Sequence, residues 1–540
     1  MDHPGSKTLG DFLDEMASRF PENEAIVFKE ERYTYKDFQD QANRIAKGLI
    51  KLGLKKGDKV ATLINNRPEW LFLAFGVAKA GGIYVPLSTF YRSRELKYAL
   101  GHCEIKMLFT IGEFLRHDFL KMVRDLLPGL DGAAPGEARF EGFPDLQCVV
   151  SLDEKTPGTY LWEDILKLGE DIPDAELERA QSVVKGDDLV YILLTSGTTA
   201  HPKAVQLLHH PVIENPFNIG ERQHFTPEDR LWVAIPVFYG MFSTNAMTAM
   251  MGHGGTMVIQ EFFDPAEALR LIEKERCTII YGFYNMLSAI LNHPDRAKRD
   301  LSSVRTGSTI GKAEEMRLMA ELAPKICHIY GLTESYGNSH LTDSDDPMEL
   351  KCQSPGKPLP GFDTRVADME TGETLPPGEI GELCLKGHVT PAYFKDPENN
   401  EKAFDKEGWF HTGDLVRVDE ENNMYFVSRL KEMLKVGGIN VSPATVENYL
   451  MSNPKIKEVH VIGYPDEKKD EVVMAVVELK KDEKATEEEI IQFCKGKIAS
   501  YCVPAYVHFL DGEEWPKTSS GKVPQKMVKE LIFSKLGIKE

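Results

Sequence analysis

Alternation of strand-like and helix-like segments is the feature that most restricts how this chain can fold. Residues 59–64 have the apolar pattern of a strand, residues 68–80 that of a helix, and residues 83–85 that of a second strand. The same order returns at residues 256–261, 264–276 and 278–281, where Asp264 and Pro265 are a good N-cap and first-turn pair. A strand–helix–strand repeat indicates parallel sheets covered by helices, so we expect an α/β fold.

The length of the chain and a change in its secondary-structure pattern near the C-terminus predict two domains. A chain of 540 residues exceeds what one hydrophobic core usually supports. Toward the C-terminus, short strands at 459–462 and 472–479 precede a charged connector at 480–489 and a helix. We predict a large N-terminal domain of layered α/β subdomains, residues 1–430, and a small α+β C-terminal domain, residues 431–540. Residues 128–144 have the composition of a loop insertion.

The charge and the cysteines limit the partners and the compartment. The 64 basic and 84 acidic residues give a formal net charge of −20, so we expect no nucleic-acid partner. The eight cysteines are scattered without a C-x-x-C pair, which is typical of the reduced cytosol. No secretory signal pattern and no apolar run of 18 residues is present. We therefore expect a soluble, cytoplasmic protein without membrane insertion.

A hydroxyl-rich segment that contains glycine follows the apolar run 189–194. Its sequence, TSGTTAHPK from Thr195 to Lys203, brings together backbone N–H groups, hydroxyls and a lysine, which phosphate oxygens require. The spacing of a Walker loop is absent. Taken alone, the segment is also compatible with a polar turn after a strand.

Two further segments carry groups suited to a nucleotide. YGLTE follows an apolar strand at 325–329, so it emerges at a strand's carboxyl end, where open α/β sheets bind ligands. Tyr330 offers a flat ring for adenine, and Glu334 a hard oxygen ligand for Mg²⁺. In WFHTGD, Asp414 follows a glycine turn and can accept two hydrogen bonds from a ribose diol. Arg429, fifteen residues later, can donate to the same ribose.

These motifs, in this order, resemble those of the adenylate-forming superfamily, which comprises acyl-CoA synthetases, luciferases and adenylation domains. The resemblance extends over nearly the whole chain and is to the acyl-CoA synthetase branch. The segments that carry it are TSGTT with Pro202 and Lys203, YGLTE at 330–334, GEL at 381–383, WFHTGD at 409–414, SRLKEMLKVGGINVSP at 428–443 and PKTSSGK at 516–522.

The resemblance implies an ATP-dependent, AMP-forming acyl-CoA ligase that works through an acyl-adenylate and uses ATP, Mg²⁺ and coenzyme A. It implies that the small domain moves about a hinge at Lys431, and that Gly437 and Gly438 line the coenzyme A tunnel. The catalytic residues implied are Lys522, Glu334, which is also the Mg²⁺ ligand, and Thr333. The ATP- and AMP-binding residues implied are Thr195, Ser196, Gly197, Thr198, Thr199, Lys203, Gly307, Ser308, Thr309, Tyr330, Gly331, Asp414 and Arg429.

The sequence departs from the family pattern in the phosphate loop. Ala200 and Ala204 stand where the family prefers glycine, and a methyl group at each is expected to stiffen the loop and affect the rate. The segment from Gly307 to Thr309 replaces the usual small residue and proline of the adenine wall.

The acyl pocket departs as well. Tyr239, followed by Gly240, stands where many fatty-acyl relatives carry histidine and many amino-acid-activating relatives carry aspartate, which argues against an amino-acid substrate. Phe283 and Tyr284 replace a small aliphatic residue and proline. Aromatic bulk at these positions suits a small cyclic, alicyclic or aromatic acid, or a short- or medium-chain acid. Packing of the same rings in the core is the alternative explanation.

Three other functions remain open at this point. The chain could be a free-standing adenylation enzyme that loads a carrier protein, or a nucleotide-binding regulator without catalysis. A luciferase-like oxygenase is compatible with the fold alone. Because each half-reaction exchanges one high-energy bond for another, the ligase could also run toward ATP formation.

Overall fold

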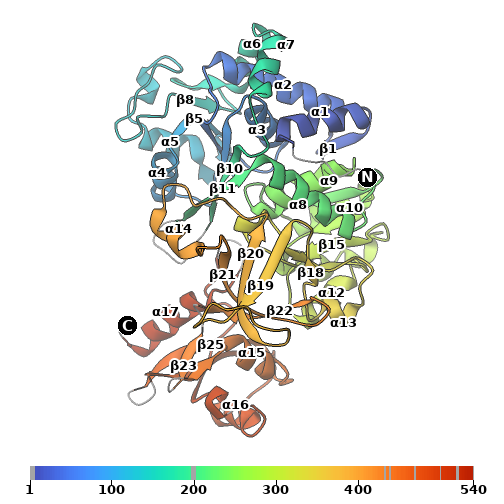
Figure 1. Ribbon diagram of the computed structural model, residues 1–540, viewed down its shortest axis with the longest axis vertical. Helices are drawn as coiled ribbons and strands as arrows, with labels where there is room; N and C mark the ends of the chain where they lie inside the picture. The colour runs from blue at the N-terminus through green and yellow to red at the C-terminus, as the bar shows by residue number, and fades with distance from the viewer. Residues whose placement is uncertain are drawn as a thin grey trace. The chain divides into compact units, whose positions relative to one another are not determined.

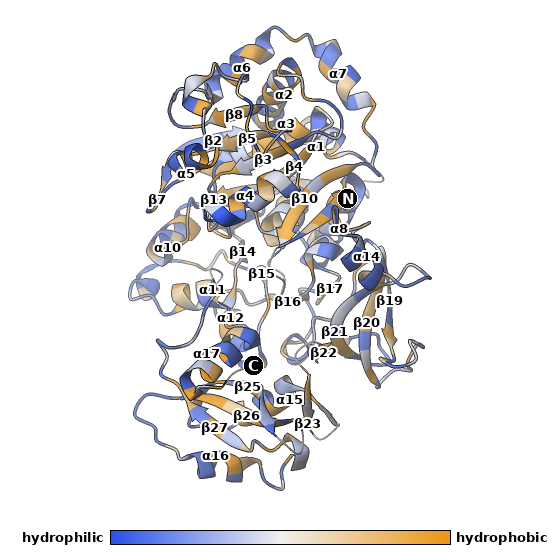
Figure 2. Cartoon of the chain, turned by 90° about the vertical axis from the view of Figure 1, so that its left-hand side faces the viewer, coloured by the Kyte–Doolittle hydropathy of each residue, from blue (hydrophilic) through white to orange (hydrophobic). Residues whose placement is uncertain are grey.

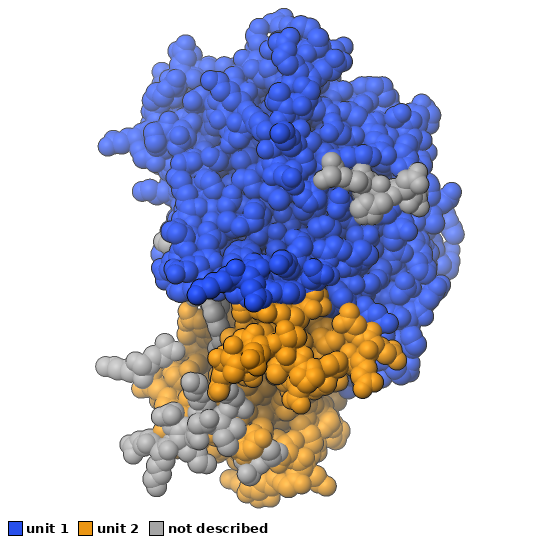
Figure 3. All heavy atoms as spheres, in the orientation of Figure 1, with its two compact units in different colours: residues 1–363, 385–410 blue, residues 364–384, 411–540 orange. Residues whose placement is uncertain are grey.

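The computed structural model describes residues 7–195, 202–430, 433–436, 439–466, 470–498, 500–518 and 522–538. The chain divides into two compact units, residues 1–363 with 385–410 (unit 1) and residues 364–384 with 411–540 (unit 2), which Figure 3 distinguishes by colour. This division differs from the predicted domains, 1–430 and 431–540, which are defined by movement and stay a prediction. The predicted hinge, Lys431, lies outside the described residues.

A nine-stranded sheet is the larger of the two main sheets of unit 1 (Figure 1). Pairing is parallel from β1 through β13, β12, β14 and β15 to β16, and antiparallel at the edge strands β2, β17 and β18. In spatial order the strands are β18 (Lys357–Pro358), β17 (His340–Leu341), β16 (Cys327–Tyr330), β15 (Thr306–Thr309), β14 (Ile279–Tyr281), β12 (Arg230–Val233), β13 (Thr256–Ile259), β1 (Glu24–Phe28) and β2 (Glu31–Thr34).

A seven-stranded sheet is the second framework of unit 1. All its pairs are parallel except that between β10 and β11. In spatial order its strands are β11 (Lys203–Leu208), β10 (Leu189–Thr195), β4 (Ile83–Pro86), β3 (Lys59–Leu63), β5 (Ile105–Thr110), β8 (Cys148–Ser151) and β9 (Tyr160–Leu161). Two short strands, β6 (Glu113–Phe114) and β7 (His117–Asp118), form a separate hairpin.

Both predicted strand–helix–strand units are confirmed. In the first, helix α3 (Pro68–Lys79) connects the parallel strands β3 and β4. In the second, α10 (Pro265–Lys274) lies between β13 and β14, and the Asp264 carboxylate accepts a hydrogen bond from the backbone N–H of Glu267 at 2.8 Å, which caps the helix as predicted. Between residues 128 and 144 the structure has only a 3₁₀ turn, Leu130–Gly132, and one isolated bridge, which confirms the loop.

Helices cover the two sheets with their apolar faces. Helix α2 (Tyr35–Lys51) buries Phe38, Ala42, Ile45 and Leu49, which recur at helical spacing. Figure 2 shows hydrophobic colouring along strands such as β10, while the helices mix hydrophobic and hydrophilic residues. The other helices of unit 1 are α1 (Leu9–Arg19), α4 (Ser93–His102), α5 (Phe119–Leu126), α6 (Trp162–Glu170), α7 (Asp174–Ser182), α8 (His209–Arg222), α9 (Met247–Gly252), α11 (Tyr284–Leu291), α12 (Ala313–Ala320), α13 (Met348–Lys351) and α14 (Pro397–Ala403).

The described part of unit 2 contains most of a four-stranded sheet and a five-stranded sheet with three α-helices. The four strands are β19 (Phe362–Ala367), β20 (Ile380–Gly387), β21 (Phe410–Val418) and β22 (Met424–Arg429), in spatial order. The other sheet has the order β24 (Ile439–Val441), β23 (Leu434–Val436), β26 (Asp470–Leu479) and β25 (Ile456–Asp466), with β27 (Tyr506–Phe509) also on β26. The helices are α15 (Pro443–Met451), α16 (Glu487–Cys494) and α17 (Gln525–Leu536).

The predicted α+β character of the C-terminal part is confirmed with two changes in detail. Strands β25 and β26 are antiparallel and longer than expected. Helix α16 begins inside the predicted connector, because the Thr486 hydroxyl and the Glu489 carboxylate each accept a hydrogen bond from the other's backbone N–H. This reciprocal cap lets a charged segment start a helix.

Among the described residues, none of the helices combines the length and the apolar character needed to cross a bilayer. All eight cysteines are buried, and none forms a disulfide.

Candidate nucleotide and acyl site

The predicted phosphate loop connects two antiparallel neighbours in the seven-stranded sheet. Thr195 ends β10, Lys203 begins β11, and the two residues are paired in the ladder. Thr195 Oγ1 lies 3.5 Å from the carbonyl oxygen of Lys203. The structure therefore locates both ends of the loop. The predicted loop residues Ser196, Gly197, Thr198 and Thr199, together with Ala200, lie outside the described residues.

Glu334 contacts a tyrosine that the sequence analysis missed. Glu334 lies in the 3₁₀ turn Thr333–Ser335, and its Oε1 accepts a hydrogen bond from the Tyr393 hydroxyl at 2.8 Å. Lys203 Nζ lies over the same ring, 4.3 Å from its centroid. Desolvation and then the charge of Glu334 raise the pKa of the buried Tyr393 phenol, so it stays a donor at neutral pH. Three segments that are distant in sequence thus meet at one point in unit 1.

Backbone pairing explains how Tyr393 reaches Glu334. The Phe394 N–H donates to the Ala204 carbonyl at 2.8 Å, and Val205 and Tyr393 form a β-bridge, so the segment after β20 lies along β11. The Thr390 N–H donates to the Glu334 carbonyl at 2.6 Å. No local pattern marks Tyr393 as functional, because only this long-range pairing brings it to the carboxylate.

Buried hydrogen bonds hold the turn that carries Glu334. Tyr336 is buried with φ of 54°, and its hydroxyl accepts a hydrogen bond from the Leu208 N–H at 3.1 Å. Asn215, on α8, donates through Nδ2 to the carbonyls of Ser335, Tyr336 and Asn338 at 3.2, 3.1 and 2.8 Å. These bonds fix the backbone that directly follows Glu334 before a ligand binds.

Tyr330 and Gly331 begin this turn. Tyr330 ends β16 with 9% exposure, and its ring meets the His340 ring edge-on at 5.9 Å. Burial lowers the pKa of His340 to about 3, so that ring is neutral. A Cβ on Gly331 would lie 1.8 Å from the carbonyl oxygen of Gly337, so the backbone itself requires glycine there. Contact of Tyr330 with adenine remains a prediction.

The side chains of the predicted adenine-wall segment point into the structure. Ser308 Oγ donates to Gln223 Oε1 at 3.1 Å, and Thr309 Oγ1 donates to the Gly282 carbonyl at 3.0 Å. Gly307 packs so closely that a Cβ would lie 2.0 Å from the Ile280 carbonyl oxygen. If residues 307–309 contact a nucleotide, they therefore do so through backbone atoms.

The predicted acyl-pocket residues adjoin the turn that carries Thr333 and Glu334. The Tyr239 and Phe283 rings meet edge-on, with centroids 6.2 Å apart. A Cβ on Gly240 would lie 3.9 Å from Thr333 Oγ1, so this glycine borders a predicted catalytic residue. Tyr284 follows Phe283 as the first residue of α11 and is half-buried. A π-helical turn, Phe242–Ala246, begins two residues after Gly240, and such turns are frequent at functional sites.

Asp414 and Arg429 are paired across two strands of unit 2. They face each other in the β21–β22 ladder, and Arg429 Nε lies 3.1 Å from Asp414 Oδ1. The Asp414 side chain is 1% exposed and that of Arg429 is 55% exposed, so one is fixed in the sheet while the other is open to solvent. The structure therefore brings together the two residues that were predicted to bind one ribose.

Lys522 lies in the same unit, and its backbone is hydrogen-bonded to that of Thr518. The Thr518 N–H donates to the Lys522 carbonyl at 2.8 Å. Desolvation and then the charge of Arg429 lower the pKa of Lys522. The residue is exposed, so repulsion from the positive charge of Arg429 contributes to this lowering of the pKa. The predicted hinge Lys431 and tunnel residues Gly437 and Gly438 lie outside the described residues.

Known proteins match the chain over nearly its whole length. Residues 13–394 match the family of AMP-binding enzymes, and residues 445–522 match the AMP-binding enzyme C-terminal domain. The chain is 34% identical to a putative acyl-CoA synthetase, YngI of Bacillus subtilis, over 97% of this chain and 96% of that protein. It is 32% identical to the mitochondrial medium-chain acyl-CoA ligase ACSF2 of Rattus norvegicus, over 98% and 88%.

Solved structures agree with these relatives. ATP-bound MatB from Rhodopseudomonas palustris superimposes with a TM-score of 0.81 at 25% identity, covering 98% of this chain and all of that one. The chain belongs to the AMP-binding enzyme family and, within the adenylate-forming superfamily, to its acyl-CoA synthetase branch, the AMP-forming acyl-CoA ligases.

Proposed function

We propose that the protein joins a carboxylic acid to coenzyme A in two half-reactions. In the first, the carboxylate attacks the α-phosphorus of ATP, the bond to pyrophosphate breaks, and an acyl-adenylate forms. In the second, the thiol of coenzyme A attacks the acyl carbon and AMP leaves. The observation that carries the proposal is the cluster of Glu334, Tyr393 and Lys203, at the start of the strand that follows the phosphate loop.

The residues of unit 1 are assigned to the phosphates and the carboxylate. Glu334 fits a Mg²⁺ ligand, since it is a hard oxygen donor whose other oxygen is held by Tyr393. Mg²⁺ bound there would supply charge neutralisation at the phosphates. Lys203 adds a second positive charge, and Thr333, which borders Gly240, is assigned to the α-phosphate.

The residues of unit 2 are assigned to the ribose, to charge stabilisation and to the thiol step. Asp414 and Arg429 bind the ribose hydroxyls, and the Lys522 ammonium group stabilises the negative charge that develops on the α-phosphate and the carboxylate. The small domain then rotates about Lys431 into the arrangement that forms the thioester. In that arrangement Gly437 and Gly438, which lack side chains, line a narrow tunnel for the pantetheine arm of coenzyme A.

For the acid, we propose a small cyclic acid or a short- to medium-chain acid. The edge-on pair of Tyr239 and Phe283 is flanked by Phe238, whose ring centroid lies 4.7 Å from that of Tyr239. Aromatic bulk beside Gly240 and Thr333 suits a compact acyl group better than a long tail. Support comes also from ACSF2, the relative named as a medium-chain ligase.

Two further assignments belong to this proposal. The eight unpaired cysteines support a cytoplasmic location. The reaction runs toward ATP when acyl-CoA, AMP and pyrophosphate are supplied together; undetectable ATP under these conditions would contradict this assignment.

Pyrophosphate release from ATP and Mg²⁺, measured against cyclic, short-chain and long-chain acids with and without coenzyme A, tests the function. We expect turnover that depends on coenzyme A and is highest with cyclic or short to medium acids. In Lys522→Ala the first half-reaction should fall about 10²- to 10³-fold, because one cation aimed at developing charge is lost. Thioester formation from supplied acyl-adenylate should be retained.

Two results would contradict parts of this scheme separately. Activity confined to long-chain acids would remove the substrate assignment and leave the ligase intact. Equal loss of both half-reactions in a folded Lys522→Ala protein would remove the role given to Lys522.

A further inference from the structure

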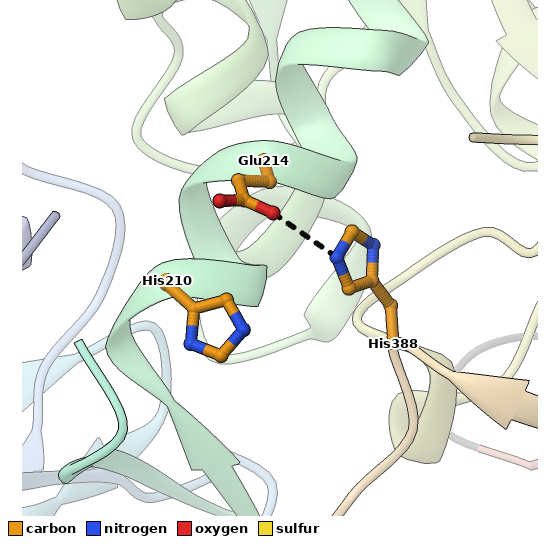
Figure 4. A group of neighbouring side chains, drawn as sticks. All are labelled: His210, Glu214 and His388. Atoms are coloured by element: carbon orange, nitrogen blue, oxygen red, sulfur yellow. Dashed lines mark hydrogen bonds and ion pairs between the residues drawn. The ribbon is translucent and has the colours of Figure 1, made fainter. Parts of the chain in front are cut away.

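Two histidines and a glutamate meet on unit 1 at a place that the adenylation chemistry does not use. His210 and Glu214 lie four residues apart on α8, so they share one face of the helix. His388 comes from the segment after β20 and turns its ring toward that face (Figure 4). Its Nε2 lies 3.2 Å from Glu214 Oε2. One ligand atom from each residue can be chosen so that all three lie within 4.8 Å of one another.

The hydrogen bonds of His210 leave one ring nitrogen for a ligand. Its Nδ1 lies 3.1 Å from the Gly186 carbonyl oxygen and 3.1 Å from Asp187 Oδ1, and since both oxygens accept, Nδ1 carries a hydrogen. Nε2 of the neutral ring then has the lone pair. A histidine that donates its other N–H to a carbonyl is the usual arrangement around protein-bound metals.

The ring of His388 is held in place from the opposite side. It meets the Phe362 ring edge-on, with centroids 5.7 Å apart, and lies against Gly361, where a Cβ would come within 2.2 Å of the ring. Its backbone N–H donates to the Gly361 carbonyl at 3.0 Å. Within the part of the chain that the structure describes, the buried Nδ1 of His388 has no hydrogen-bond partner. This imidazole is therefore fixed in position with a donor or acceptor still unsatisfied.

The ion pair of His388 with Glu214 accounts for two of the three residues, and His210 has an ion pair of its own with Asp187 on the other side of its ring. A metal ion would in addition account for the convergence of all three side chains. Two nitrogen donors and one carboxylate are the ligand set that Zn²⁺ binds in proteins, at about 2.0–2.2 Å. Two ligands on one tetrahedral ion of this kind lie about 3.3–3.6 Å apart, so side-chain rotations would have to close the gap from 4.8 Å.

We propose that His210, Glu214 and His388 bind one divalent transition-metal ion of the zinc class, separate from the Mg²⁺ that accompanies ATP. Such an ion would join α8 to the segment after β20. Both elements support the catalytic turn: Asn215 follows Glu214 and holds the carbonyls around Tyr336, while Thr390 and Tyr393 follow His388 and contact Glu334. The ion would therefore stabilise unit 1 at the supports of Glu334.

Two other groups of possible ligands are weaker candidates. In one, the His411 ring is already bonded to Glu382, which also accepts the Gly413 N–H, and Cys384 is fully buried. In the other, His224, Asp343 and Asp345 lie on the surface with side chains 39–61% exposed. Solvated groups of this kind are common without a metal, which makes His224 a matched control.

Metal binding to the purified full-length protein tests the proposal directly. After treatment with a chelator, and without nucleotide, Zn²⁺ is titrated against a chromophoric chelator, and Co²⁺ is used as a spectroscopic substitute. We expect one tight site per chain, Co²⁺ bands typical of nitrogen and oxygen ligands, and a rise in unfolding temperature with Zn²⁺. The variants His210→Gln, Glu214→Gln and His388→Gln should each weaken binding at least about 10-fold, whereas His224→Gln should not.

The outcome does not depend on whether a variant is destabilised. The rise in unfolding temperature caused by Zn²⁺ is compared within each variant, so a folded protein that has lost only the site shows a normal transition without the rise. Absence of tight Zn²⁺ binding to the native protein would overturn the proposal. So would binding that survives all three variants, or that is lost in His224→Gln.

Discussion

At the scale of single residues, Tyr393 is a residue that the sequence did not predict but that contacts two predicted site residues in the structure. Its hydroxyl holds one oxygen of Glu334, and its ring lies under the ammonium group of Lys203. A single buried tyrosine thus positions a predicted metal ligand and a predicted phosphate ligand. We regard it as a positioning residue, because it acts through these two side chains.

Tyr393→Phe should lower kcat/KM for adenylation about 10-fold. The variant keeps the ring under Lys203 and removes one hydrogen bond to a carboxylate, an interaction worth about 1.5–3 kcal/mol. The Mg²⁺ concentration needed for half-maximal pyrophosphate release should rise, because the Glu334 carboxylate is less well oriented, while the unfolding temperature changes little.

The matched control is Tyr425→Phe, which removes a similar hydrogen bond to Asp419 outside the predicted site. It should leave the Mg²⁺ dependence as it is in the native protein. An unchanged Mg²⁺ dependence in Tyr393→Phe would show that the bond to Glu334 does not position the ligand.

At the scale of elements, a buried lysine connects three helices of unit 1. Lys79, at the end of the apolar helix α3, is 1% exposed, and its Nζ lies 2.5 Å from Asp14 Oδ1 on α1. Gln181 on α7 accepts a second hydrogen bond at 3.3 Å. Desolvation lowers the pKa of Lys79, and the charge of Asp14 opposes that change. The charge inside this apolar helix therefore depends on a partner that the local sequence does not show.

Asp14→Ala should destabilise unit 1 by about 2–3 kcal/mol, somewhat less than the 3–5 kcal/mol typical of breaking a buried pair, because Asp14 is partly exposed. Lys79→Met removes the charge together with the need for a partner and should cost less than about 1.5 kcal/mol. Chemical unfolding measures the free energy of unfolding of both variants.

The control is Asp40→Ala, which breaks the exposed pair with Lys36 and should change the free energy of unfolding by less than about 0.5 kcal/mol. A change as small as this in Asp14→Ala would show that Lys79 does not depend on Asp14.

At the scale of the whole molecule, the predicted nucleotide residues are divided between the units. Glu334, Thr333 and Lys203 belong to unit 1, while Asp414, Arg429 and Lys522 belong to unit 2. A change of pH that destabilises one unit therefore affects only the predicted nucleotide residues that this unit carries. The pH dependence of unit 2 can be examined through His411, three residues before Asp414.

Stability that comes from His411 should fall as pH rises above neutrality. Hydrogen bonding with Cys384 and then with Glu382 raises the pKa of His411 to about 10. The folded form thus binds a proton more tightly than the unfolded form, whose pKa is about 6.5. The resulting stabilisation is complete below about pH 6.5 and is lost as pH rises through about 10.

Unfolding of the native protein and of His411→Gln, compared from pH 6 to pH 10, measures this effect. The difference in unfolding free energy should be largest near pH 6 and should shrink steadily toward pH 10. A difference that stays constant over this range would show that the proton is not bound more tightly in the folded protein.

The sequence by itself determined the α/β architecture, the small α+β part and most of the nucleotide-binding candidates, because these depend on local patterns. Strand periodicity, the Asp264 cap and runs such as TSGTT and YGLTE are formed by neighbours along the chain. Even the pairing of Asp414 with Arg429 follows from two strands joined by a short turn.

Only the tertiary structure decided which distant residues meet. Tyr393 reaches Glu334 because residues 389–394 lie along β11, and His388 reaches α8 through the same segment. The inward hydroxyls of Ser308 and Thr309 likewise depend on partners from other elements, Gln223 and Gly282. The physical reason is the same in each case: these contacts join segments far apart in sequence, so no local periodicity or spacing encodes them.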